Sequence, residues 1–136
     1  MVTRHRAREV ALQMLFQFDA SELPAQEVVH LYESSFGEGA LPNDFSIELF
    51  LAIAASLAKI DETIGKSSEN WRLDRMSRVD RNILRIGVHE ICHCQEVPVR
   101  VAINEAVELA KRYGTDESAA FVNGILDRVA RDEQKL

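Results

Sequence analysis

The fold is decided by the stretch Ser77–Cys94, which reads SRVDRNILRIGVHEICHC. Apolar residues recur in it every three or four positions, at Val79, Ile83 and Ile86. This spacing is typical of an amphipathic helix. Ser77 stands where a helix N-cap is expected, and Asp80 follows it as a shorter version of the capping-box carboxylate. Because a helix rarely continues into a proline, the stretch predicts a helix that ends near Cys94, before Pro98.

Outward from this stretch, helical periodicity continues through most of the chain. The first helix is expected over about residues 4–19, and a second begins near residue 24. A third opens at 43 or 44 and continues to about 60, and a short fourth ends near 65–68. A sixth covers about 99–113, and a seventh, capped by residue 115 or 116, ends near 131. Thr3 is a suitable N-cap for the first, the segment 37–42 is a loop, and Gly114 is a good residue to end the helix before it. Sustained period-two alternation and hairpin turns are missing. The 136 residues therefore predict an all-α fold in one domain, residues 1–136.

Charge is distributed unevenly, although the formal net charge is −6. The segment 19–62 holds nine acidic residues and one lysine, whereas the segment 71–87 holds five arginines and two aspartates. Arg78, Arg81 and Arg85 follow helical spacing and form one row, which is a candidate rail for phosphate groups. A solvated face, or ion pairs with the acidic first half, explains the row equally well.

A second basic cluster lies at the start of the chain. Arg4, Arg6 and Arg8 occur there without an acidic residue among them. Phe16 projects away from the apolar stripe of the first expected helix. An exposed ring beside arginines is typical of single-stranded RNA recognition, in which the ring stacks on a base and guanidinium groups hold phosphate. The alternative is that Phe16 packs under a neighbouring segment of the same domain.

Several functional classes are not expected. No apolar run is long enough to span a membrane, and the first residues lack a signal-peptide pattern, so a cytoplasmic protein is expected. Cys92 and Cys94 lie about 200° apart around a helix, which disfavours a shared metal ion and favours reduced, buried thiols. Catalytic motifs are missing, and the acidic pairs Asp74 with Asp80 and Glu105 with Glu108 lack a nucleophile or orienting partner. We therefore expect no catalytic residue, no metal and no cofactor.

Three stretches together resemble the NusB family. They are RHRARE at residues 4–9, VDRNILRI at 79–86 with VPVRVAINEAVELAKRYG at 97–114, and FVNGILD at 121–127. Their order and spacing match the family across nearly the whole chain. The combination of AINEAVELAK with FVNGILD is specific, whereas any one short piece would be weak.

The resemblance implies an all-α fold of about seven helices in two packed helical subdomains. It also implies a transcription antitermination factor that binds single-stranded boxA RNA of ribosomal RNA transcripts. Its implied partner is NusE, a small-subunit ribosomal protein, and it reaches RNA polymerase and other Nus factors indirectly.

Residue by residue, the resemblance implies RNA contacts and partner contacts. The implied RNA-binding residues are Arg4, Arg6, Arg8, Phe16 and Arg85, to which the charge pattern adds Arg78 and Arg81. The implied partner-binding residues are Asp80, Tyr113, Glu117 and Phe121. Two positions depart from the family pattern: Ala120 replaces a lysine, and His5 replaces a residue that is often arginine. Both departures are expected to weaken RNA affinity.

Two other functions remain open on the sequence. One is a self-associating helical interaction module, since some family members are described as dimers, and a homodimer could hide the RNA face. The other is an RNA-binding module related to the N-terminal domain of ribosomal RNA cytosine methyltransferases. RNA titrations, light scattering and methylation assays would separate these alternatives.

Overall fold

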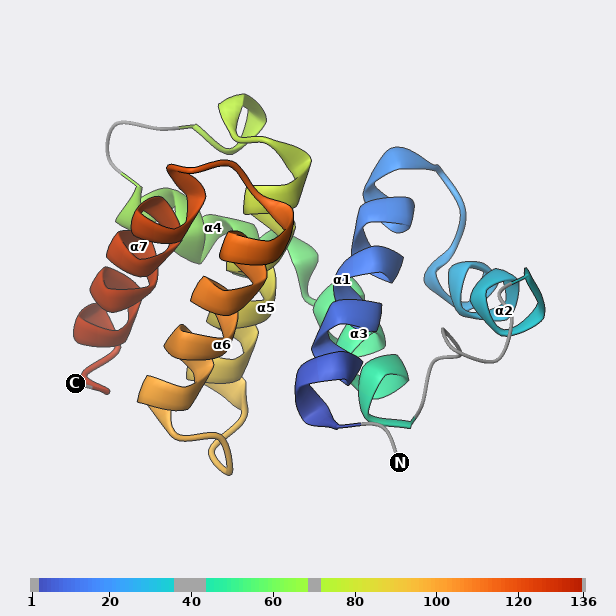
Figure 1. Cartoon of the computed structure of the whole chain (residues 1–136), viewed down its shortest axis with the longest axis horizontal. Helices are drawn as coiled ribbons and strands as arrows, with labels where there is room; N and C mark the ends of the chain where they lie inside the picture. Colours follow the sequence, from blue (N-terminus) through green and yellow to red (C-terminus); the bar gives the residue numbers. More distant parts are fainter. Residues whose placement is uncertain (1–2, 36–43, 69–71, 136) are drawn as a thin grey trace. The chain divides into compact units, whose positions relative to one another are not determined.

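A computed structural model describes residues 3–35, 44–68 and 72–135. Within these ranges the chain forms helices joined by short connections, and the predicted all-α class is confirmed (Figure 1). The helices fall into two compact units, residues 1–56 and residues 57–136. The predicted loop at 37–42 lies outside the described residues.

The first unit holds three helices, α1 (Arg4–Ala20), α2 (Ala25–Ser35) and α3 (Asp44–Ala55). Thr3 caps α1 as predicted, because its hydroxyl accepts the Arg6 N–H at 3.1 Å. Each helix contributes an apolar face to the core of the unit. Its fully buried side chains include Met14, Leu15, Val28, Phe50 and Ile53.

The second unit holds α4 (Leu57–Ser67), a short 3₁₀ helix η2 (Leu73–Arg75), α5 (Arg78–His93), α6 (Val99–Tyr113) and α7 (Ser118–Asp132). Helix α5 contacts α4, α6 and α7, so it is the centre of this unit (Figure 1). Gly87 on α5 permits a close approach to α7, because a Cβ there would lie 2.5 Å from Leu126 Cδ1.

The boundaries of three helices agree closely with the sequence prediction, but two boundaries were wrong. The third helix was expected to continue to about residue 60, yet it ends at Ala55, and α4 begins at Leu57. The Ser56 N–H donates to the Ile53 carbonyl at 3.1 Å, which is a tighter turn than an α-helix makes. Thr115 or Asp116 was expected to be the N-cap of the seventh helix, but the helix begins at Ser118, and its N-cap residue Glu117 makes no side-chain capping bond.

Gly114 ends α6 as predicted, but not by the left-handed conformation that glycine usually supplies. Its backbone is extended, with φ −94° and ψ −164°. The glycine is needed for space instead, because a Cβ at this position would lie 2.4 Å from Ser118 Oγ and 2.8 Å from the Ala110 carbonyl oxygen. The short turn after Gly114 therefore packs directly against the start of α7.

Candidate interaction site

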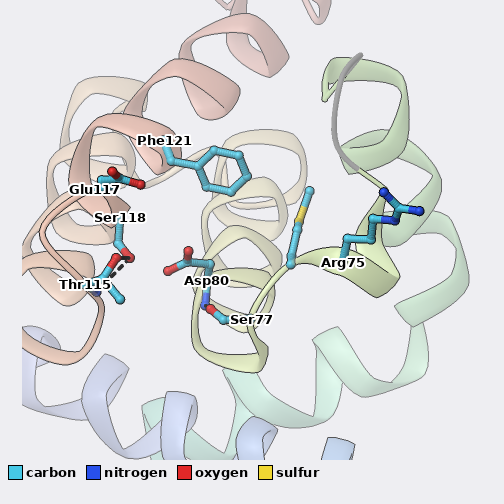
Figure 2. A pocket seen from close by; sticks show the side chains of 8 residues that line it. Arg75, Ser77, Asp80, Thr115, Glu117, Ser118 and Phe121 are labelled. Atoms are coloured by element: carbon cyan, nitrogen blue, oxygen red, sulfur yellow. Dashed lines mark hydrogen bonds between the residues drawn. The ribbon is translucent and has the colours of Figure 1, made fainter.

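A pocket lies where the starts of α5 and α7 meet in the second unit. We call it the α5–α7 pocket; its volume is about 180 Å³, and Figure 2 shows its lining side chains. The lining residues are Arg75, Met76, Ser77, Asp80, Thr115, Glu117, Ser118 and Phe121. They come from two segments that are distant in the sequence, residues 75–80 and 115–121, so the pocket depends on the tertiary fold.

Local hydrogen bonds fix the two helix starts that form the pocket. On α5, the Ser77 hydroxyl accepts the Asp80 N–H at 3.0 Å, as a helix cap does. On α7, the Ser118 hydroxyl accepts the Thr115 N–H at 2.9 Å, while the Ser118 N–H donates to the Thr115 carbonyl at 3.1 Å. Both walls of the pocket are therefore held by short-range capping bonds.

Only half of the expected capping box at Ser77 is formed. The Ser77 hydroxyl accepts a backbone N–H, but Asp80 Oδ1 is buried and has no hydrogen-bond partner among the described residues. Figure 2 shows Asp80 reaching from α5, and Phe121 reaching from α7, toward the space between the two helices. The Asp80 carboxylate therefore faces the pocket instead of closing the helix end.

Three of the four predicted partner-binding residues lie together in this pocket. Asp80, Glu117 and Phe121 line it, whereas Tyr113 does not. The half-buried ring of Tyr113 lies 5.6 Å from the Arg112 guanidinium. The sequence analysis missed Arg75, Thr115 and Ser118. For Thr115 and Ser118 the signal was turn chemistry before α7, which was interpreted as a simple N-cap. Arg75 was counted only as part of the basic segment 71–87.

The RNA-binding residues predicted on α1 differ in their exposure. Phe16 is 41% exposed, so the alternative that it packs inside the domain is wrong. Arg4 is exposed, and its guanidinium lies 4.7 Å from the centre of the Phe45 ring. Arg6 is half-buried, and its Nη1 donates to Glu9 Oε1 at 3.0 Å.

Arg8 is not the exposed cation that the sequence suggested. It is only 3% exposed, and its guanidinium lies 5.6 Å from the centre of the Phe45 ring. A guanidinium over an aromatic face gains a cation–π attraction. Arg8 therefore contributes to the packing of α1 against α3. The burial of its side chain could not be predicted from its position in a basic cluster.

The prediction that three arginines form an exposed row on α5 is also wrong. Arg78 is exposed, but Arg81 is half-buried, and its Nη1 donates to the Leu73 carbonyl at 3.1 Å. Arg85 is 5% exposed. Its Nε and Nη2 donate to the two carboxylate oxygens of Asp61, each at 2.8 Å.

This fork between Arg85 and Asp61 joins α5 to α4. A third bond, from Arg85 Nη1 to Asn82 Oδ1 at 2.8 Å, satisfies the remaining face of the guanidinium. Asp61 belongs to the acidic segment of the sequence. The alternative of ion pairs with that segment is therefore the correct interpretation for Arg85. The expectation that α1 and α5 present cations on one common face stays a prediction.

Cys92 and His93 line a pocket of about 140 Å³ together with side chains of α4. In the described ranges, no group of three or more metal-binding side chains gathers. Cys92 and Cys94 are half-buried free thiols rather than fully buried ones. Burial raises the pKa of the Cys92 thiol. Among the helices that the structure describes, none is both long and apolar enough to cross a membrane.

Comparison with known proteins gives a consistent result. The model of the NusB family matches residues 5–131. A transcription antitermination protein NusB of Sorangium cellulosum is 48% identical over 97% of this chain and 94% of its own length. One of Myxococcus xanthus is 43% identical over 96% of both chains.

Solved structures agree with this result. A NusB of T. maritima superposes with a TM-score of 0.84 at 34% identity, over 98% of this chain and 96% of that one. A structure described as antitermination factors NusB and NusE in complex with dsRNA superposes with a TM-score of 0.77 at 26% identity, over 95% of this chain and 96% of that one. With sequence, fold and motif order in agreement over nearly its whole length, this chain belongs to the NusB family.

Proposed function

We propose that this protein is a transcription antitermination adaptor that binds boxA RNA of ribosomal RNA transcripts together with NusE. The observation that carries the proposal is the solved complex of NusB and NusE with double-stranded RNA, whose matching chain shares this fold over 95% of the present chain. The adaptor acts where transcripts are made, in the cytoplasm, and it reaches RNA polymerase and other Nus factors through its partners. It performs no catalytic step of its own.

On the RNA side, exposed cations and one exposed ring supply the expected chemistry. Arg4 and Arg78 are exposed, so they can approach phosphate groups without first breaking a buried contact. The Phe16 ring can stack on an unpaired base, a contact that is worth about 1–3 kcal/mol per base. Arg8 and Arg85 act instead as positioning residues, because their guanidinium groups are buried.

On the protein side, the α5–α7 pocket is the proposed contact with NusE. Asp80 and Glu117 supply two carboxylates, and Phe121 supplies an apolar ring. Tyr113 is the last residue of α6 and does not line the pocket, so it is kept as a peripheral contact. Protein interfaces depend on a few such well-placed groups rather than on every residue they cover.

The test is a titration of fluorescently labelled boxA RNA, with and without NusE, followed by anisotropy. NusE should tighten RNA binding, and Phe16→Ala should weaken it by roughly tenfold or more, as the loss of one stacked base implies. Arg78→Ala should also weaken RNA binding. Its matched control is Lys111→Ala, which removes an exposed cation on α6 that is paired with Glu108 at 3.5 Å and should leave RNA binding unchanged.

Two outcomes would contradict the proposed function. Absence of any NusE-dependent gain would remove the adaptor role. An RNA-independent dimer seen by light scattering, with no RNA bound, would favour the self-associating module instead.

A further inference from the structure

The aromatic ring of Phe45 lies against two arginine side chains of α1. The guanidinium carbon of Arg4 is 4.7 Å from the centre of this ring, and that of Arg8 is 5.6 Å from it. Phe45 is the second residue of α3, and Figure 1 shows the starts of α1 and α3 at the same end of the first unit. Side chains four positions apart on a helix are neighbours, so both arginines reach one ring.

The two arginines differ in how deeply they are buried. Arg8 is 3% exposed, so its contact with Phe45 is part of the packing inside the unit. Arg4 is exposed, and the Phe45 ring is half-buried. Phe45 is therefore anchored in the unit while it supports a guanidinium that solvent, and a bound ligand, can reach.

This support of Arg4 differs chemically from an ion pair. Arg6 Nη1 donates to Glu9 Oε1 at 3.0 Å, so a carboxylate offsets the charge of Arg6. An aromatic ring attracts a guanidinium through its quadrupole but carries no net charge. Phe45 therefore restricts the Arg4 side chain without neutralising it. A cation that is restricted in this way loses less rotamer freedom when it binds a phosphate group.

From these contacts we infer that Phe45 is a positioning residue of the RNA site, whose ring holds the Arg4 guanidinium in place for a phosphate group of the RNA. The inference rests on the proposed function, in which Arg4 is an RNA contact. It adds a residue that the sequence analysis did not single out. Phe45 acts through Arg4 and does not itself contact the RNA, while the buried Arg8 packs against the same ring.

A double-mutant cycle between Phe45 and Arg4 tests the inference. The Kd for labelled boxA RNA is measured by anisotropy for the wild type, Phe45→Leu, Arg4→Ala and the double variant, at several salt concentrations. Phe45→Leu should weaken RNA binding by about two- to fivefold, the range that an exposed cation–π contact spans. In the Arg4→Ala background, Phe45→Leu should have no further effect on the Kd.

The salt dependence of the Kd separates a cation that is poorly positioned from one that is lost. Arg4→Ala removes a phosphate contact, so the slope of log affinity against log salt should become shallower by about 0.7. Phe45→Leu should leave this slope unchanged, because the guanidinium is still present and still reaches the phosphate group. A loss of packing alone would not make the effect of Phe45 depend on Arg4.

Matched variants complete the design. Phe45→Tyr keeps the ring and should bind RNA as tightly as the wild type. Phe18→Leu controls for lost aromatic packing between the same two helices, because the Phe18 ring lies edge-on to Phe50 with 5.8 Å between the ring centres, and it should leave the Kd for RNA unchanged. Far-ultraviolet circular dichroism checks that each variant is folded.

A second variant tests the inference even if Phe45→Leu does not fold. Arg4→Lys keeps the positive charge on an exposed side chain. A lysine ammonium is compact and strongly hydrated, so it gains less from an aromatic face than a guanidinium does. Arg4→Lys should therefore weaken RNA binding, although the number of charges is the same.

The inference would be overturned if Phe45→Leu left the Kd for RNA unchanged. It would also be overturned if Phe45→Leu weakened binding equally in the Arg4→Ala background, because the ring would then act independently of Arg4, or if Arg4→Lys bound RNA as tightly as the wild type. If the wild type shows the NusE-dependent gain in RNA affinity but Phe45→Leu matches it, only the positioning inference fails. If the wild type shows no gain, the proposed function fails.

Discussion

Arg85 gives the sharpest prediction, because its buried fork makes it a structural residue rather than a direct RNA contact. Arg85→Ala removes two 2.8 Å bonds to Asp61 and one to Asn82. Removing one partner of a buried ion pair costs about 3–5 kcal/mol. The Asp61 side chain is 27% exposed and can be partly rehydrated, so we expect the lower end, about 3 kcal/mol.

The assay is urea unfolding followed by circular dichroism, together with RNA titration of each variant. The midpoint of unfolding should fall strongly for Arg85→Ala, and also for Asp61→Asn, which leaves the guanidinium without its counter-charge. The double variant Arg85→Met with Asp61→Leu should recover much of the loss, because apolar replacements of buried ion pairs are often tolerated. If Arg85→Ala changed the unfolding free energy by less than about 0.5 kcal/mol, within the range of an ordinary surface substitution, while RNA binding was lost, the structural role would be refuted.

Three further predictions concern two glycines and one histidine. Gly124→Ala should stabilise the protein by about 0.5–1 kcal/mol, because the helical site has open space around a new Cβ. Gly87→Ala should destabilise it by about 1–3 kcal/mol, since its Cβ would meet the buried Leu126 side chain. A urea midpoint of Gly124→Ala that is not above the wild type's, or one of Gly87→Ala that is not below it, would contradict the corresponding prediction. Burial and the nearby His93 lower the pKa of His89, so the unfolded chain takes up this proton first and stability should fall as the pH drops below about 6.5. Thermal unfolding from pH 7.5 to 5 checks this, and His89→Gln should flatten the dependence; an unchanged slope would remove His89 as its source.

The sequence predicted most accurately the elements whose ends are set by nearby residues. Helix α6 runs from Val99 to Tyr113 as expected, because Pro98 and Gly114 mark its two ends locally. The break at Ser56 was missed because the apolar residues around it continue without a glycine or proline. The change from one helix to the next there coincides with the boundary between the two units.

The candidate site was predicted only in part, for a related reason. Helical spacing predicts the direction in which a side chain points, but not whether another segment of the chain buries it. It therefore found the exposed Phe16 and misjudged Arg85, whose partner lies 24 residues earlier. The resemblance to the NusB family supplied Asp80, Glu117 and Phe121. The pocket that unites them depends on a turn at Gly114 whose packing the sequence did not reveal.

The most direct measurement is hydrogen exchange of backbone amides before and after NusE is added. The N–H groups at the starts of α5 and α7 are held at most by short-range bonds at the helix ends, such as those to Ser77 Oγ and Ser118 Oγ. They should therefore exchange faster in the free protein than the N–H groups in the helix interiors. We expect NusE to slow exchange at residues 77–81 and 115–121. Slowed exchange confined to other segments, with these two unchanged, would contradict the assignment of the α5–α7 pocket as the partner site.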